Sequence, residues 1–353
     1  MAMHPHPARR SPATRITVIF LLLLLALTAL VVVRLYTGDL PGAAKFRWPS
    51  GIILETHAML IVAAIITGAA LAGSGVALQA LLRNPLAEPF ILGLSSGAAL
   101  GVMVQRYILE WLRNAPAGGE AGDTSAAMQW LAGAHYEAAL LGAAATMAIV
   151  YIAGRRGGLV DPLMLLLTGV VVSMINGSLI LLIRFLMPLE RWQDISFWMA
   201  GQLSEAHSWP TVALIGGLTV VGGVLLWCLG RAMDAASFSD AEAASLGVNL
   251  ARLRLLLFLT AAALAGGAVV LAGPLAFIGL VAPHLARLML GPAHRNLILA
   301  AAIIGAGLVV AADLAVRLLS QGRGILPIGI FTVALGGPIF ILMLRARLGR
   351  TSM

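Results

Sequence analysis

The sequence predicts an all-α polytopic membrane protein of about ten transmembrane helices. Sixty per cent of its residues are hydrophobic and only 11% are charged, whereas ordinary soluble domains carry roughly 25% charged residues. From His57 to Gln105 the only charges are Arg83 and Glu88, and both lie in the hinge 83–89. A bilayer core of roughly 30 Å needs about 20 apolar residues per helix. This stretch is therefore expected to form two spans joined by a short polar turn.

Apolar stretches follow one another along the whole chain, separated by short polar segments. They lie at about 16–36, 57–82, 90–107, 131–153, 163–187, 209–230, 253–272, 274–290, 297–318 and 326–344. The seventh and eighth come from one uncharged stretch, which we divide at Gly273-Pro274 because proline cannot continue a helical hydrogen-bond ladder. One long tilted helix is the alternative.

The first apolar run is expected to be a membrane anchor. It follows Arg9, Arg10 and Arg15, but it is longer than the apolar part of a usual signal peptide, and no small-residue cleavage site follows it. The chain thus divides into a tail over 1–15, one transmembrane domain over 16–348 and a second tail over 349–353.

The basic residues predict the orientation of the chain. Ten helices place both termini on one side, and with the termini inside, fourteen of the 23 basic residues but only five of the 15 acidic residues are cytoplasmic. This agrees with the positive-inside rule. We therefore expect a multi-pass protein of a bacterial inner membrane with cytoplasmic termini. The positive net charge reflects topology and gives no reason to expect a nucleic-acid partner.

The sequence holds no nucleotide site of its own. Its only lysine, Lys45, lies between Ala44 and Phe46, so no phosphate-binding loop ending in Lys-Ser/Thr exists. The single cysteine, Cys228, excludes a disulfide framework, and no histidines share a helix face at metal-ligand spacing. We expect no cofactor and no metal.

One short motif raises the alternative of an intramembrane serine hydrolase. Residues 93–97 fit G-x-S-x-G, with His284 and Asp313 as distant partners. A nucleophile elbow needs a strand before the serine, whereas small residues at this spacing favour close helix packing. The packing interpretation is preferred.

Polar groups inside the predicted spans are few and mostly neutral. They are Ser74, Gln79, Asn84, Thr168, Ser173, Asn176 and Asp313. A transporter driven by an ion gradient usually places acidic or basic groups within its spans, and here Asp313 is nearly alone and is expected to pair with Arg317 one turn later. Such a transporter remains an alternative. A wall of small aliphatic groups is better suited to a large solute.

An internal echo suggests two related halves. Residues 70–78 match residues 263–271 at six of nine positions, and in the predicted topology the two segments run in opposite directions, as inverted repeats do. Chance similarity in a chain rich in Ala, Leu and Gly is the alternative.

The most informative polar segment lies between the sixth and seventh spans, at 239–254. Ser239 is a good N-cap, Asp240 and Glu242 place negative charge in the first turn, and Gly247 ends the helix. Asn249 then begins the next helix, in which Arg252 lies in the first turn. Such a compact helix is well shaped to dock into a groove on a cytoplasmic partner, and a plain connector is the alternative.

Several longer motifs resemble one family. They lie at Gly68 to Gly75 with Gln79, Arg83 to Pro89, Leu92 to Ala98, Phe197 to Leu203, Leu246 to Asn249, Gly273 to Arg287, Leu326 to Gly329 and Gly336 to Pro338. Across 57–348 the chain resembles the permease subunits of ABC importers for ferric siderophores, haem and cobalamin, the FecCD-type family.

The resemblance implies a function and partners. A permease dimer, of two copies or of this chain and a paralogue, would enclose one path, with two ATPase subunits docked below. Ser239, Asp240, Glu242, Leu246, Gly247, Asn249 and Arg252 would form the coupling element, and Gln79, Asn84 and Leu86 would lie along the path and its inner gate.

The resemblance also implies an extracytoplasmic binding protein, which docks through arginines. Here the chain departs from the family, because the usual Arg-x-Pro-Arg before the second span is replaced by 57–60, His-Ala-Met-Leu. Docking is expected to depend on Arg317, with Arg323 close by, or on Arg47 or His57.

Overall fold

Helices make up nearly all of the regular structure, as predicted. The computed structural model describes residues 12–37, 51–114, 128–131, 133–156, 159–188, 198–204, 207–320 and 326–351. Within them, the long helices are α1 (Pro12–Tyr36), α2 (Ile52–Leu81), α3 (Leu94–Asn114), α5 (His135–Ala153), α6 (Pro162–Leu186), α8 (Trp209–Ala236), α10 (Leu250–Ala272), α11 (Ile278–Leu290), α12 (His294–Ser320) and α13 (Ile328–Thr351). The short helices are η1 (Pro89–Leu92) and α9 (Asp240–Ser245).

The ten long helices occupy the ten predicted apolar stretches. By length and composition, 7 of the described helices can cross a membrane, while α11 and the apolar part of α13 are shorter. Two strands of two residues each, β1 (Arg155–Arg156) and β2 (Leu159–Val160), form a small antiparallel hairpin between α5 and α6. This hairpin was not predicted from the sequence.

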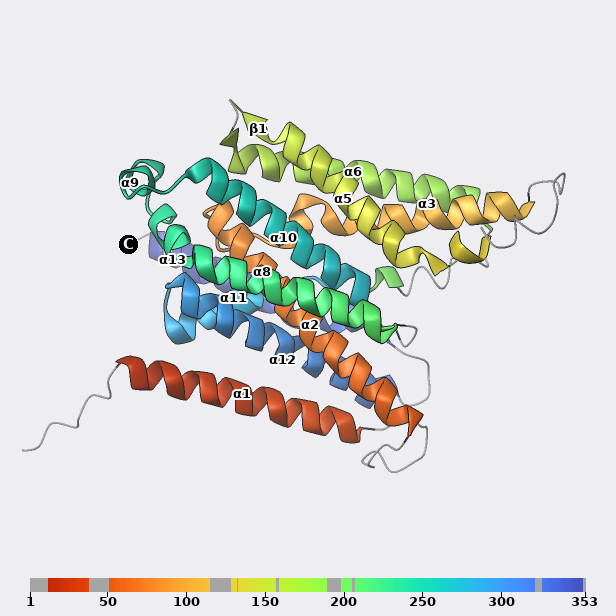
Figure 1. The fold of residues 1–353 in the computed structure, drawn as a ribbon, viewed down its shortest axis with the longest axis horizontal. Coiled ribbons are helices and arrows are strands. Elements are labelled where there is room, and N and C mark those ends of the chain that lie inside the picture. Colours follow the sequence, from red (N-terminus) through yellow and green to blue (C-terminus); the bar gives the residue numbers. More distant parts are fainter. Residues whose placement is uncertain are drawn as a thin grey trace, which may run out of the picture.

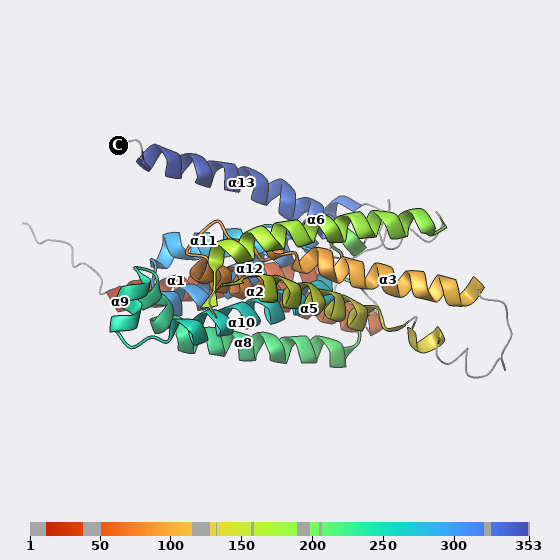
Figure 2. The same cartoon turned by 90° about the horizontal axis from the view of Figure 1, so that it is seen from above.

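The long helices lie roughly along one direction (Figure 1). The start of α1, the end of α13 and α9 all lie at one end of the bundle, which we call the α9 end. Seen from above, α6 and α13 form one face, and α5, α8 and α10 lie toward the other face (Figure 2).

Helix α2 is the centre of the bundle, in contact with α8, α10, α11 and α12. Glycines let its backbone touch its neighbours: a Cβ on Gly68 would overlap the backbone of Gly305, and one on Gly75 would overlap Gly279. Helix α1 instead lies at the edge along α12 (Figure 1). Close glycine contacts are typical of helices that associate in lipid, where packing replaces the hydrophobic effect.

The break at Gly273-Pro274 is confirmed, and the single tilted helix is wrong. However, the predicted helix over 274–290 begins only at Ile278, because Gly273 (φ 63°) and Phe277 (φ 68°) both adopt left-handed backbone conformations. At about 1.5 Å per residue, its 13 residues extend about 20 Å. Helix α11 is therefore shorter than a full membrane crossing.

The two echo segments lie side by side in α2 and α10 and run in opposite directions (Figure 1). Each is followed by Pro-Leu-Ala, at 85–87 and 274–276, and then by Phe-Ile, at 90–91 and 277–278. Each helix also ends in a break before a shorter element, η1 or α11. This arrangement agrees with the predicted inverted repeat.

Candidate functional site

The segment 239–249 is a short helix closed at both ends by its own hydrogen bonds. The Ser239 hydroxyl accepts from the Glu242 N–H (3.1 Å), which caps the helix, and donates to the Glu242 carboxylate (2.9 Å). At the other end, Val248 N–H donates to Ala243 O and Gly247 N–H to Ala244 O, the Schellman pattern. Helix α9 is thus a rigid unit.

Two exposed apolar side chains flank α9. Phe238 is 78% exposed before it, and Leu246 is 71% exposed after it. The next helix, α10, begins at once, because Asn249 Oδ1 accepts from the Arg252 N–H at 3.0 Å, and the Arg252 side chain is exposed. An exposed, pre-formed helix with apolar edges fits docking to another protein.

Asp240 in α9 joins three parts of the chain. Its carboxylate accepts hydrogen bonds from Arg83 in the hinge and from Arg254 in α10 (2.8 and 3.0 Å). Arg83 also donates to Ala236 O at 2.8 Å. Burial raises the pKa of Asp240, but the hydrogen bond from Arg83 and the charges of Arg254 and Arg83 outweigh this and hold the pKa below its ordinary 3.8. We call these three residues the Asp240 cluster.

The hinge between α2 and η1 continues from Arg83 into the bundle. Asn84 builds its turn, since its side-chain oxygen accepts from the Leu86 N–H (3.0 Å) and its carbonyl accepts from the Ala87 N–H (3.0 Å). Further along, the Glu88 carboxylate accepts from the Phe277 N–H at the start of α11. The hinge therefore connects α9, through Arg83, to Phe277, the N-cap residue of α11, through Glu88.

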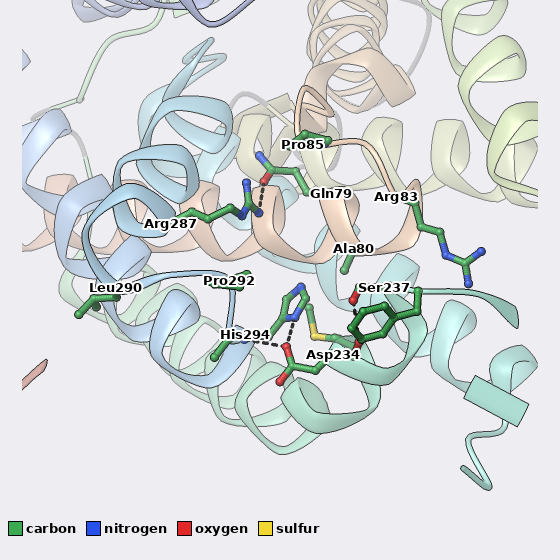
Figure 3. Close-up of a pocket in the computed structure, with 13 residues that line it drawn as sticks. Gln79, Ala80, Arg83, Pro85, Asp234, Ser237, Arg287, Leu290, Pro292 and His294 are labelled. Atoms are coloured by element: carbon green, nitrogen blue, oxygen red, sulfur yellow. Dashed lines mark hydrogen bonds and ion pairs between the residues drawn. The ribbon is translucent and has the colours of Figure 1, made fainter. Parts of the chain in front are cut away.

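The predicted path residue Gln79 lies on the α11 side of this hinge. Its amide donates to Gly279 O (3.4 Å) and accepts from Arg287 (3.0 Å), as Figure 3 shows for Arg287. Leu86 packs against Leu280 and Val281. The three predicted gate residues thus all lie where the end of α2 and its hinge meet α11.

A pocket of about 540 Å³ opens between these elements and the ends of α8 and α12 (Figure 3). Gln79 and Arg287 line one side, and His294 and Asp234 line the other. The His294 ring and backbone N–H both bond to one oxygen of Asp234, at 2.6 and 3.0 Å.

The α6 and α13 face carries an open groove of about 730 Å³. Its lining is almost entirely apolar: Phe90, Ser95, Met199, Ala200, Pro274, Ala276, Gly329, Ile330, Val333 and Ala334. The two breaks, at Phe90 and Pro274, contribute to the same surface. This wall matches the small, mostly neutral lining that the sequence predicted for a path.

The structure describes two of the predicted docking residues, His57 and Arg317, whereas Arg47 and Arg323 lie outside the described residues. His57 is buried near the start of α2. Arg317 does pair with Asp313, at 3.5 Å, but Arg34 of α1 binds the same carboxylate and is fully buried. Sequence reasoning missed Arg34, because an arginine near the end of an apolar run looks like an ordinary interfacial residue.

The serine motif has no hydrolase geometry. A 3-10 helix, η1, precedes it, and Gly93 (φ 82°) leads directly into α3. The Gly97 backbone lies against Thr146 and Gly142 of α5, and Gly101 lies against Ala138. The motif therefore serves helix packing, as preferred from the sequence.

These features define a class of protein: a polytopic α-helical membrane protein with an apolar groove on one face and an exposed, capped helix at one end. The comparisons refine this class. The FecCD transport family model matches residues 16–346, so the chain belongs to the FecCD transport family.

Relatives whose names give different substrates are similar to the chain to about the same degree. The hemin transport system permease protein HmuU of Yersinia pestis is 33% identical over 93% of this chain and 95% of its own length. The vitamin B12 import system permease protein BtuC of Vibrio vulnificus is 30% identical over 96% of each. A solved chain, assigned to an inward-facing metal-chelate type ABC transporter, superposes with a TM-score of 0.77 at 26% identity over 95% of this chain and 99% of its own. The chain is a permease subunit of this type of ABC importer.

Proposed function

We propose that the chain is the membrane conduit of an ATP-driven importer, and that it passes a metal chelate of the siderophore, haem or cobalamin class from an extracytoplasmic binding protein to the cytoplasm. The observation that carries this proposal is the Asp240 cluster, which ties the docking helix to the hinge. The names of the relatives support the substrate class but do not choose within it.

The coupling would run through the hinge. An ATPase bound to α9 would displace Asp240 as it closes, and the hydrogen bond from Arg83 to Asp240 would transmit this displacement to the hinge. Because the same hinge holds the start of α11 through Glu88, the displacement reaches both breaks that border the groove. A movement of this kind repacks helices between inward-open and outward-open arrangements.

The partners follow from the faces of the molecule. Two ATPase subunits would bind at the α9 end, which is then cytoplasmic together with the termini, in a bacterial inner membrane. A second permease, a copy or a paralogue, would cover the α6 and α13 face and close the groove into a path. The binding protein would dock at the opposite end, near Arg317.

The test replaces residues 242–246 with a Gly/Ser linker in the complex with its ATPase and binding protein. We expect a folded, membrane-inserted permease that no longer takes up chelate, because the rigid docking unit is gone. The matched control is Arg231→Gln, an exposed change at the same end that leaves α9 intact and should preserve uptake. Undiminished uptake by the linker variant would refute the coupling role.

A second measurement separates this function from an ion-gradient transporter. Proteoliposomes that contain the complete complex should accumulate chelate with ATP and no proton gradient. Accumulation by the permease alone, driven by a gradient, would overturn the proposal.

A further inference from the structure

A second apolar groove lies between α5, α8 and α10. These three helices lie toward the side of the bundle away from the α6 and α13 face (Figure 2). The groove has a volume of about 470 Å³, and its surface is almost entirely carbon. Helix α5 forms one wall with Leu140, Ala144, Ala148 and Tyr151, and Phe258 of α10 lies at the base. The volume falls within the roughly 300–1,000 Å³ of ligand pockets.

The groove is open because the side chains along it are small. Helix α5 packs on α3, α6 and α10, while α8 packs on α2, α10 and α12. Ala262, Ala263 and Gly266 of α10 line the gap between them, and an added Cβ on Gly266 would meet only Leu140, at 3.9 Å. The lining therefore leaves room for another apolar body.

The groove has the length of one lipid leaflet. From Leu140 to Tyr151, α5 rises about 16 Å at 1.5 Å per residue, and half of a bilayer core is roughly 15 Å. Both walls belong to helices that can span a membrane, so acyl chains are the medium that surrounds the opening.

A positively charged side chain, that of Arg155, lies at the end of the groove nearest the α9 end. The Arg155 guanidinium lies over the ring of Tyr151, 5.4 Å from its centre, and the Arg155 side chain is exposed. Nearby, Arg254 donates to Val160 O, at 3.2 Å, in the β1–β2 hairpin. Arginine favours phosphate oxygens, and anionic headgroups attract cations at this boundary.

We propose that this groove is a binding site for an anionic diacyl phospholipid. One acyl chain lies between α5 and α8 on α10, and the phosphate lies against Arg155 above Tyr151. The site is independent of the translocation groove, which lies on the other face.

The experiment measures lipid retention by the complete permease complex in native mass spectrometry, with phosphatidylglycerol and phosphatidylcholine of identical chains as probes. The wild type should retain phosphatidylglycerol in preference. Ala148→Phe fills the groove and should reduce retention about tenfold, equivalent to about 1.4 kcal/mol. Ala145→Phe is the matched control, since Ala145 is exposed on the same helix but does not line the groove, and should leave retention unchanged.

Two further variants complete the test. Arg155→Gln should abolish the preference for phosphatidylglycerol while acyl-chain occupancy remains. Gly266→Leu fills the groove from α10 and should repeat the loss if Ala148→Phe fails to fold. Equal retention of both lipids by the wild type, or unchanged retention by the filled variants, would overturn the proposal, as would an equal loss in Ala145→Phe.

Discussion

An aspartate between two arginines occurs at both ends of the bundle, in contrasting surroundings. At the α9 end, the side chain of Asp240 is 50% exposed, and those of Arg83 and Arg254 are 35% and 14% exposed. Toward the other end, Asp313 is 5% exposed, Arg34 is 0% and Arg317 is 8%. The chemical groups are the same, and only their access to water differs.

This difference separates a movable connection from a fixed one. Exposed ion pairs contribute roughly 0–1 kcal/mol because water competes for both partners. The ion pairs of the Asp240 cluster can therefore break and re-form at little cost in free energy. Removing one member of a buried pair costs roughly 3–5 kcal/mol. The Asp313 group is therefore suited to hold α1 against α12 throughout the cycle.

The largest expected effect comes from breaking the buried group. Asp313→Asn leaves Arg34 and Arg317 without their shared carboxylate and should lower the free energy of unfolding by about 3–5 kcal/mol. Reversible unfolding in mixed micelles would measure it. The double variant Arg34→Leu with Asp313→Asn removes the α1–α12 pair together and should recover much of the loss. If the single variant is as stable as the wild type, the fixed connection does not exist.

A substitution of Arg317 tests whether the Asp313 group also contacts the binding protein. If a carboxylate of the binding protein reaches it, Arg317→Ala should weaken docking by about 2–5 kcal/mol, as for one half of a desolvated charge pair. Calorimetric titration with the binding protein measures this. His57→Ala serves as a comparison, since His57 is buried. Unchanged affinity in Arg317→Ala would show that Arg317 takes no part in docking.

The exposed cluster should matter more for transport than for stability. Asp240→Asn and Arg83→Gln, alone and combined, should change the free energy of unfolding by less than about 1 kcal/mol. Chelate transported per ATP hydrolysed should fall roughly tenfold, within the about 1–3 kcal/mol typical of coupling between sites. A double-mutant cycle on uptake should show that the two losses are not additive. Additive losses would mean that the two residues act separately.

The smallest effect concerns pH. The pKa of Asp240 is lower in the folded chain than its ordinary 3.8, so its contribution to stability is fully present above that value and is lost only as pH falls through the folded pKa. The Arg83–Asp240 coupling energy should therefore be the same at pH 5 and at pH 8. A marked decrease between these two values would show that another group controls the cluster.

The sequence predicted most of the helices because lipid imposes a simple rule of length and composition on each one. The break at Gly273-Pro274 was predictable from proline alone. The late start of α11 was not, since it depends on the left-handed backbone of Phe277, a residue type that gives no local warning of such a conformation.

The site was predictable in its parts and not in its connections. Ser239 and Gly247 marked the two ends of α9, and Asn249 marked the start of α10, because caps are local signals. The contact of Asp240 with Arg83 spans 157 positions of the sequence, and that of Arg34 with Asp313 spans 279. No periodic pattern in the sequence predicts ion pairs between residues so far apart. Arg254, which also binds Asp240, was not among the residues predicted for the coupling element.

The contact of Gly68 with Gly305 limits what transport can move. Because a single methyl group on either residue would collide with the opposite backbone, α2 and α12 have no clearance to slide past one another while they stay in contact. We therefore expect a rearrangement to carry α2 and α12 together, with α1 attached through the Arg34–Asp313 pair. The remaining helices would then move relative to α1, α2 and α12, which form the fixed part of the permease.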